Sequence, residues 1–110
     1  MHEFGIMETV LRDAAAASGG APLRALKVRV GPLSGVVVDA LRFAFESLAP
    51  GSAVEGARLA VVETRPQLRC PECGTLYETE VGEYRCPKCG SAAGELVAGN
   101  EMELESIEVE

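Results

Sequence analysis

The sequence lacks the residues that most enzymes and nucleic-acid-binding proteins depend on. It has no tryptophan and one histidine, and its 17 acidic residues outnumber its 10 lysines and arginines, for a net charge of −7. This charge disfavours a nucleic-acid partner, because contact with phosphates needs a basic face. The lone histidine lies at the extreme start of the chain, so no Ser–His–Asp or Cys–His set is available. We therefore expect a protein that is not an enzyme.

Long apolar runs are also missing, and this limits where the protein can reside. No stretch is long enough to span a membrane, so we expect no membrane insertion. A basic and then apolar secretory start is absent too, because residues 1–13 already carry three acidic groups. The remaining expectation is a cytoplasmic protein whose thiols stay reduced. With 110 residues, there is room for one compact domain and a small module that needs a metal or another cross-link.

All four cysteines occur in two Cys-x-x-Cys pairs. Cys70 pairs with Cys73 and Cys86 with Cys89, twelve residues separate the pairs, and a glycine follows each one. Four thiolates in a closed shell suit structural Zn(II) best and leave no open position for a substrate. Disulfides, Cys-x-x-Cys redox chemistry and a rubredoxin-like iron centre are the alternatives that this spacing leaves open.

Hydrophobic periodicity predicts two helices and three strands around the cysteine segment. We expect the first helix over residues 4–18, and a second that is capped by Ser34, runs to about residue 49 and has a core stripe starting at Val37. The expected strands cover residues 24–30, 57–64 and 102–109. In the last strand the alternation changes phase near Glu105 and Ser106, which indicates a β-bulge.

These elements predict an α+β fold. A helix between the first two strands implies that they are parallel, with a right-handed crossover. The last strand would complete a small three-stranded mixed sheet with two helices. Between the second and last strands, the cysteine segment would form an inserted, zinc-ribbon-like module with two Cys-x-x-Cys knuckles.

The first three residues offer a second, different metal site. The amine of Met1, the backbone nitrogen and imidazole of His2, and the nearby backbone nitrogen of Glu3 can form fused chelate rings. Nitrogen ligands that include amides suit square-planar Ni(II) or Cu(II). Such a site would be open and rather weak, because each amide must lose a proton before it binds. It would suit a metal that has to be handed on.

Taken together, these features resemble the HypA/HybF family of hydrogenase maturation nickel metallochaperones. The resemblance covers nearly the whole chain and depends on the order of its motifs. The motifs are Met1-His2-Glu3 opening into an amphipathic helix, Val30-Gly31-Pro32-Leu33-Ser34-Gly35, Asp39-Ala40-Leu41-Arg42-Phe43-Ala44-Phe45-Glu46, the two knuckles, and Gly99-Asn100-Glu101-Met102 before the closing strand.

The resemblance implies two domains with different metals. Residues 1–65 and 98–110 would form a nickel-binding α/β domain, and residues 66–97 a zinc-binding domain. Transferable Ni(II) would bind at Met1, His2 and Glu3, with Asp39 in the vicinity, and structural Zn(II) at the four cysteines.

The resemblance also implies what the protein works with. It implies delivery of nickel to the large-subunit precursor of a [NiFe] hydrogenase, together with a HypB-type GTPase and, in some family members, urease maturation proteins. The alternative function is a zinc-ribbon adapter that binds another protein and carries no transferable metal.

Overall fold

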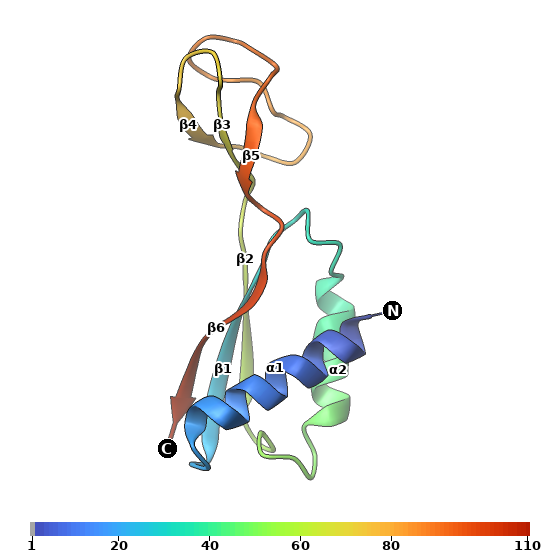
Figure 1. The fold of residues 1–110 in the computed structure, drawn as a ribbon. Helices are drawn as coiled ribbons and strands as arrows, with labels where there is room; N and C mark the ends of the chain where they lie inside the picture. The colour runs from blue at the N-terminus through green and yellow to red at the C-terminus, as the bar shows by residue number, and fades with distance from the viewer. Residues whose placement is uncertain (1) are drawn as a thin grey trace.

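The computed structural model describes residues 2–110. Figure 1 shows a long molecule with two helices and the larger of two sheets at one end, and the smaller sheet at the other. The elements are α1 (Glu3–Ser18), β1 (Leu23–Val30), α2 (Val38–Leu48), β2 (Arg58–Glu63), β3 (Gln67–Arg69), β4 (Leu76–Glu78), β5 (Glu95–Ala98) and β6 (Met102–Val109). Within this described part of the chain, neither helix is both long and apolar enough to cross a membrane.

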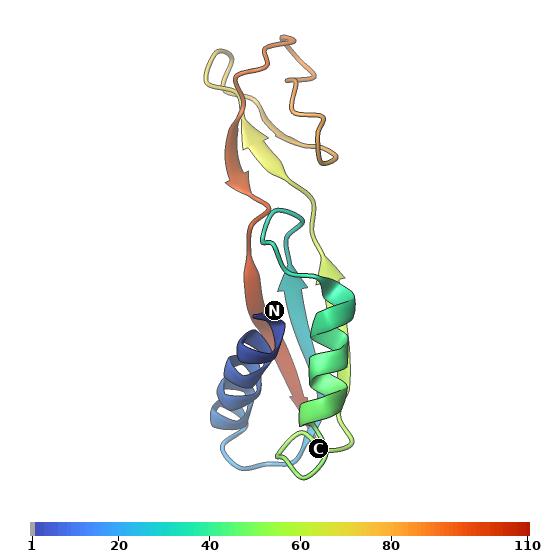
Figure 2. The ribbon, with the colours of Figure 1, turned by 90° about the vertical axis from the view of Figure 1, so that its right-hand side faces the viewer.

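The larger sheet confirms the predicted α+β fold. Its strand order is β2-β1-β6, with β1 parallel to β2 and antiparallel to β6. Both helices lie on the same side of this sheet, as the two views in Figures 1 and 2 show. The two-helix, three-stranded mixed arrangement is therefore the one that the hydrophobic pattern predicted.

The main core lies between the helices and the sheet. It contains Met7, Val10 and Ala14 from α1, together with buried residues of β1 and α2. Burying this apolar surface stabilises the layer by about 25 cal/mol for each Å² removed from water. One predicted core residue is misplaced, because Val37 is 58% exposed. It precedes α2 with an extended backbone, so its side chain is not in the helical stripe.

The start of α2 was also predicted too early. Ser34 does not cap the helix, since its hydroxyl accepts a hydrogen bond from the Val36 N–H at 3.1 Å within a tight turn. Gly35 then adopts a left-handed conformation, with φ 81°. A serine that bonds to a backbone amide two residues later offers the chain an alternative to the helix. The helix therefore begins at Val38, and Asp39 lies in its first turn.

The predicted bulge in β6 is confirmed. Leu104 pairs with Val28 and Ser106 pairs with Lys27, so Glu105 is the extra residue between two neighbouring pairs. An extra residue reverses which face the following side chains take. It explains how Leu104 and Ile107, three positions apart, both pack against the main core.

The smaller sheet and its core are built separately from the larger ones. Its strand order is β4-β3-β5, with β3 antiparallel to both neighbours. Its core consists of Leu68, Cys70, Tyr77 and Cys86, with Tyr84 packed against it. Because the Tyr77 hydroxyl donates to the Tyr84 carbonyl at 2.6 Å, the loop between the two cysteine pairs is tied to β4.

Glu101 organises the joint between the two sheets. Its backbone carbonyl accepts a hydrogen bond from Gly31 at 2.7 Å, and its carboxylate accepts one from Gly99 at 2.8 Å. A side chain at Gly31 would collide with the Gly99 carbonyl oxygen, so the two chain segments approach as closely as backbones can. Hydrogen bonds from its own N–H and from Gly99 lower the pKa of Glu101, with a contribution from Arg29 3.5 Å away.

Candidate metal centre

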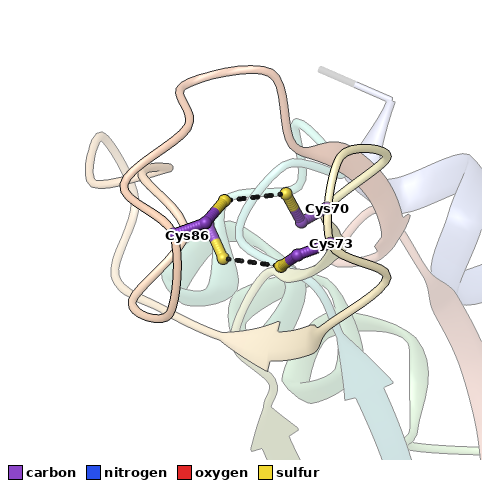
Figure 3. A group of neighbouring side chains, drawn as sticks. Cys70, Cys73 and Cys86 are labelled. Atoms are coloured by element: carbon purple, nitrogen blue, oxygen red, sulfur yellow. Dashed lines mark hydrogen bonds between the residues drawn. The ribbon is translucent and has the colours of Figure 1, made fainter.

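The four cysteine side chains converge at the end of the smaller sheet. Their ligand atoms all lie within 4.8 Å of one another, and they are the only such group of potential metal ligands in residues 2–110. Cys70 and Cys89 have sulfurs 3.5 Å apart, and Cys73 and Cys86 have sulfurs 3.6 Å apart. Figure 3 shows the side chains of Cys70, Cys73 and Cys86 converging. Four thiolates at about 2.3 Å from a central zinc ion would lie about 3.8 Å from each other. The observed spacing therefore fits a tetrahedral four-thiolate site.

The two cysteine pairs form knuckles with the same hydrogen-bond pattern. In the first knuckle, Gly74 N–H donates to the Cys70 carbonyl at 2.7 Å; in the second, Gly90 N–H donates to the Cys86 carbonyl at 2.9 Å. Both glycines have a φ near 80°, which residues with a side chain rarely adopt. The glycine after each pair is therefore needed to close the turn that aims both sulfurs at the same point.

The sulfur distances also test the disulfide alternative. A disulfide needs an S–S distance of about 2.05 Å, and all four residues are free cysteines. The four thiols differ in environment, since Cys70 and Cys86 are buried whereas Cys73 and Cys89 are exposed. The geometry thus favours a shared metal over covalent pairing.

Hydrogen bonding makes the four sulfurs electrostatically unequal. The Thr75 hydroxyl, 3.1 Å from Cys73 Sγ, lowers the pKa of Cys73 to about 6. The Ser91 backbone acts to lower the pKa of Cys89, but the three other cysteines and burial together raise it to about 12. Four thiolates this close cannot all be ionised unless a cation lies between them. The cluster is thus suited to a divalent metal.

The N-terminal site residues lie at the start of α1. Met1 falls outside the described residues, so its predicted role as a ligand stays a prediction. His2 is exposed and precedes the helix as its N-cap, and its carbonyl accepts a hydrogen bond from Ile6 at 2.9 Å. An exposed imidazole at a helix start is accessible to a metal ion from solution.

Glu3 has a position that sequence reasoning did not foresee. It is 5% exposed, and its carboxylate accepts a hydrogen bond from the Val37 N–H at 3.0 Å. This bond is the largest of several causes that lower the pKa of Glu3 to about 2. It joins the first turn of α1 to the residue that precedes α2. No pattern in the sequence shows this contact, because its partners are 34 residues apart.

Among residues 2–110, Asp39 forms no ligand cluster with His2 and Glu3. It lines a hollow beside Arg42 and Thr64, whereas His2 lines a separate groove between α1 and β6. A role for Asp39 near nickel therefore remains a prediction.

An exposed aromatic pair beside the N-terminal residues was also missed. Phe4 and Phe43 have ring centroids 6.1 Å apart in an edge-to-face arrangement, and Phe43 is 62% exposed. The contact joins the two helices close to Glu3. One signal for this pair is present in the sequence, which is that Phe4 and Phe43 are aromatic residues outside the predicted buried faces of the two helices.

Replacing Glu3 by alanine should destabilise the metal-free protein. The substitution leaves the Val37 N–H without its carboxylate partner, and an unsatisfied polar group near the core is costly. We expect the melting temperature at neutral pH to fall by several degrees. The matched control is Glu8→Ala, which removes an exposed glutamate from the same helix and should have little effect. Equal melting temperatures for the two variants would contradict this role of Glu3.

Comparison with known proteins identifies the family. The profile described as "Hydrogenase/urease nickel incorporation, metallochaperone, hypA" matches residues 1–109. The chain belongs to the HypA family. The match covers both sheets and both candidate metal-binding segments. It places the protein in a family of metallochaperones for nickel incorporation.

Curated HypA proteins are similar over nearly their whole length. "Hydrogenase maturation factor HypA" of Roseiflexus sp. (strain RS-1) is 40% identical over 114 residues, covering 100% of this chain and 93% of the relative. The protein of the same name from Geobacter metallireducens is 34% identical over 111 residues, covering 100% of both.

Solved HypA structures share the fold. The solution structure of the Ni metallochaperone HypA from Helicobacter pylori superposes with a TM-score of 0.67 at 25% identity, covering 99% of this chain and 97% of that one. A second solution structure of a HypA protein has a TM-score of 0.71 at 26% identity, covering 99% and 96%.

Proposed function

We propose that this HypA protein binds Ni(II) at its N-terminus and delivers it to the large-subunit precursor of a [NiFe] hydrogenase during maturation. Membership of a nickel-incorporation family supports the cargo and the process. The main structural support for an N-terminal nickel site is the position of Glu3. Its hydrogen bond from the Val37 N–H holds the first turn of α1 in place. A tripeptide chelate next to a fixed turn has less freedom to lose when it binds a metal.

The structure of Glu3 narrows which of its atoms would bind nickel. Its carboxylate is already hydrogen-bonded to Val37. The ligands we propose are therefore the amine of Met1, the backbone nitrogens of His2 and Glu3, and the His2 imidazole. Deprotonated amides favour the square-planar geometry of Ni(II). Asp39 would act nearby, not as part of this chelate.

The cysteine cluster has the role of a resident structural site in this proposal. Cys70, Cys73, Cys86 and Cys89 would hold Zn(II), and a closed four-thiolate shell stabilises a small fold without exchanging ligands. Residues 66–97 would thus be the zinc-binding domain, and residues 1–65 with 98–110 the nickel-binding domain. The small size of the second core fits a module that needs a metal to fold.

The proposed partners follow from the family. We propose that a HypB-type GTPase acts with this protein, and that urease maturation proteins are further candidates. The four free thiols are consistent with the cytoplasm, where disulfides are rare.

Nickel titration of the untagged, zinc-loaded protein tests the proposal. We expect one Ni(II) to bind in addition to zinc. Removing a residue that only contacts a metal ligand typically lowers metal affinity by about 10–100-fold. His2→Gln removes a proposed ligand itself, so we expect a larger loss of nickel affinity. Glutamine is chosen because a bulky second residue disfavours removal of Met1, and mass spectrometry of both proteins checks that Met1 is retained.

The matched control for His2→Gln is Glu8→Gln, which neutralises an exposed residue of α1 and should bind nickel as the native protein does. If the native protein bound zinc alone, the proposed carrier function would be wrong and a zinc-ribbon adapter would be favoured.

A further inference from the structure

A groove runs between α1 and β6, on the side of the sheet that the helices cover. Its volume is about 910 Å³, within the size range of ligand-binding clefts. Ile6 and Val10 of α1 form one apolar wall, and Met102 and Leu104 of β6 form the other. His2 also lines the groove, so it reaches the start of the chain. Figure 1 shows α1 lying across the strands near β6.

The strand that forms the second wall is an edge of the sheet. β6 pairs with β1 on one side and with no other strand in residues 2–110. An unpaired edge leaves N–H and C=O groups available to another strand. The groove therefore combines apolar walls with free backbone hydrogen-bonding groups.

The hydrogen-bond pattern indicates which backbone groups are free. Gly31 N–H donates to the Glu101 carbonyl, and Leu33 N–H donates to the Gly99 carbonyl. Residues of an antiparallel pair alternate between bonding each other and facing outward. Continuing this alternation along the register directs the N–H and C=O groups of Met102 and Leu104 away from β1. The residues whose side chains line the groove thus also offer their backbone groups to a new strand.

The charge of the groove selects its occupant. Asp13 and Glu103 line it, and no lysine or arginine of the described residues does. Glu103 contacts Arg29 at 3.5 Å, but Arg29 also contacts Glu101 and Glu105. With Lys27 beside Glu105, two cations serve three carboxylates. Exposed pairs of this kind contribute little, and the negative field persists.

The same charges work against pairing with a second copy of this chain. β6 reads Met-Glu-Leu-Glu-Ser-Ile-Glu-Val over residues 102–109, with a further glutamate at position 110. Two such strands side by side would bring glutamates close together, and like charges on neighbouring strands repel each other. A basic strand would meet no such penalty.

We propose that the groove between α1 and β6 binds an extended, positively charged segment of a partner protein. The segment adds to the sheet as a strand beside β6, with hydrogen bonds to Met102 and Leu104. Its alternate side chains fill the apolar groove. Because Glu103 alternates with Met102 and Leu104 along β6, the basic residues lie beside Glu103 on the opposite face of the strand, and Asp13 adds negative charge at the groove itself. This is recognition by strand addition, in which main-chain bonds supply affinity and the groove supplies selectivity.

Binding of the segment does not require the proposed nickel site. Only the transfer of nickel to the bound partner depends on that site. Because His2 lines the same groove, a bound segment would extend toward the proposed nickel ligands. A partner held there would receive nickel over a short path.

A blocked peptide of alternating lysine and valine, as long as β6, is the probe. We expect it to bind the zinc-loaded, nickel-free protein, to shift the amide NMR signals of Met102 and Leu104, and to slow their hydrogen exchange. A peptide with glutamate in place of lysine should bind at least about tenfold more weakly, because the groove carries negative charge.

Two double variants with the same change in net charge test the site. Asp13→Asn with Glu103→Gln should weaken binding of the lysine peptide by about tenfold, because both lining carboxylates are neutralised. Glu8→Gln with Glu46→Gln neutralises two exposed helix residues outside the groove and should leave binding within about twofold. Equal melting temperatures confirm that both fold.

Three results would overturn the proposal: no binding of the lysine peptide, equal losses in the two double variants, or concentration-dependent self-association through β6, which would make a second copy the occupant. The failure of nickel binding is a separate result. The Asp13 and Glu103 variant should bind the peptide more weakly and bind nickel normally, so the two failures are distinguishable.

Discussion

Replacing Cys73 by alanine should release the zinc and unfold the smaller sheet, while the larger sheet stays folded. The binding free energy of a structural zinc site is about 10–16 kcal/mol and is coupled to the folding of the module that holds it. The core of this module has only four buried residues, two of which are cysteines. Three remaining thiolates cannot close a tetrahedral shell, so most of that free energy should be lost.

Zinc content by mass spectrometry and amide NMR dispersion of residues 67–97 measure this outcome. We expect collapse of dispersion in that segment, and retained signals from the main core residues such as Leu26 and Leu41, which pack without the module. Glu72→Ala is the matched control, because Glu72 lies between the two cysteines of the same knuckle and is exposed. A Cys73→Ala protein that kept one tightly bound zinc and an unchanged melting profile would show that the cysteines are not the site.

Adding residues before Met1 should abolish specific nickel binding. A peptide bond at the Met1 nitrogen removes the lone pair of the proposed amine ligand and breaks the first chelate ring. We expect nickel affinity to fall by more than about 100-fold, the upper end of the loss seen when an outer-shell partner is changed, because a direct ligand is removed. Isothermal titration with Ni(II) after removal of any histidine tag measures this effect.

The matched control carries the same added residues after Glu110. That end of the chain continues β6 beyond Val109, and the Glu110 N–H donates to the Pro22 carbonyl at 3.1 Å, so it lies against the start of β1. We expect native nickel affinity for this control and full zinc content for both forms. Nickel affinity that survived the N-terminal extension would exclude the amine as a ligand.

Local sequence was sufficient for most of the elements. The apolar stripe of α1 and the alternation in β1 predicted the buried faces, because burial of one face imposes a period of 3.6 or 2 on the residues. The phase change at Glu105 predicted the bulge for the same reason. Prediction failed at the start of α2, where Ser34 bonds to the Val36 N–H and keeps the chain in a turn. A serine before a helical pattern can cap the helix or bond to an amide within a turn. Only the final path of the backbone decides which bond forms.

The cysteine centre and the N-terminal site differ in how far sequence determines them. Two knuckles of fixed spacing carry their own turn geometry, since each glycine closes its own loop, so the sequence alone determined that four sulfurs would converge. Other features join residues far apart in the chain. They are the bond from Val37 to Glu3 and the groove between α1 and β6, where the backbone groups of Met102 and Leu104 face outward. Only the tertiary structure decided these long-range features. Such contacts form only after the helices and strands have packed, and no local pattern encodes which residues then meet.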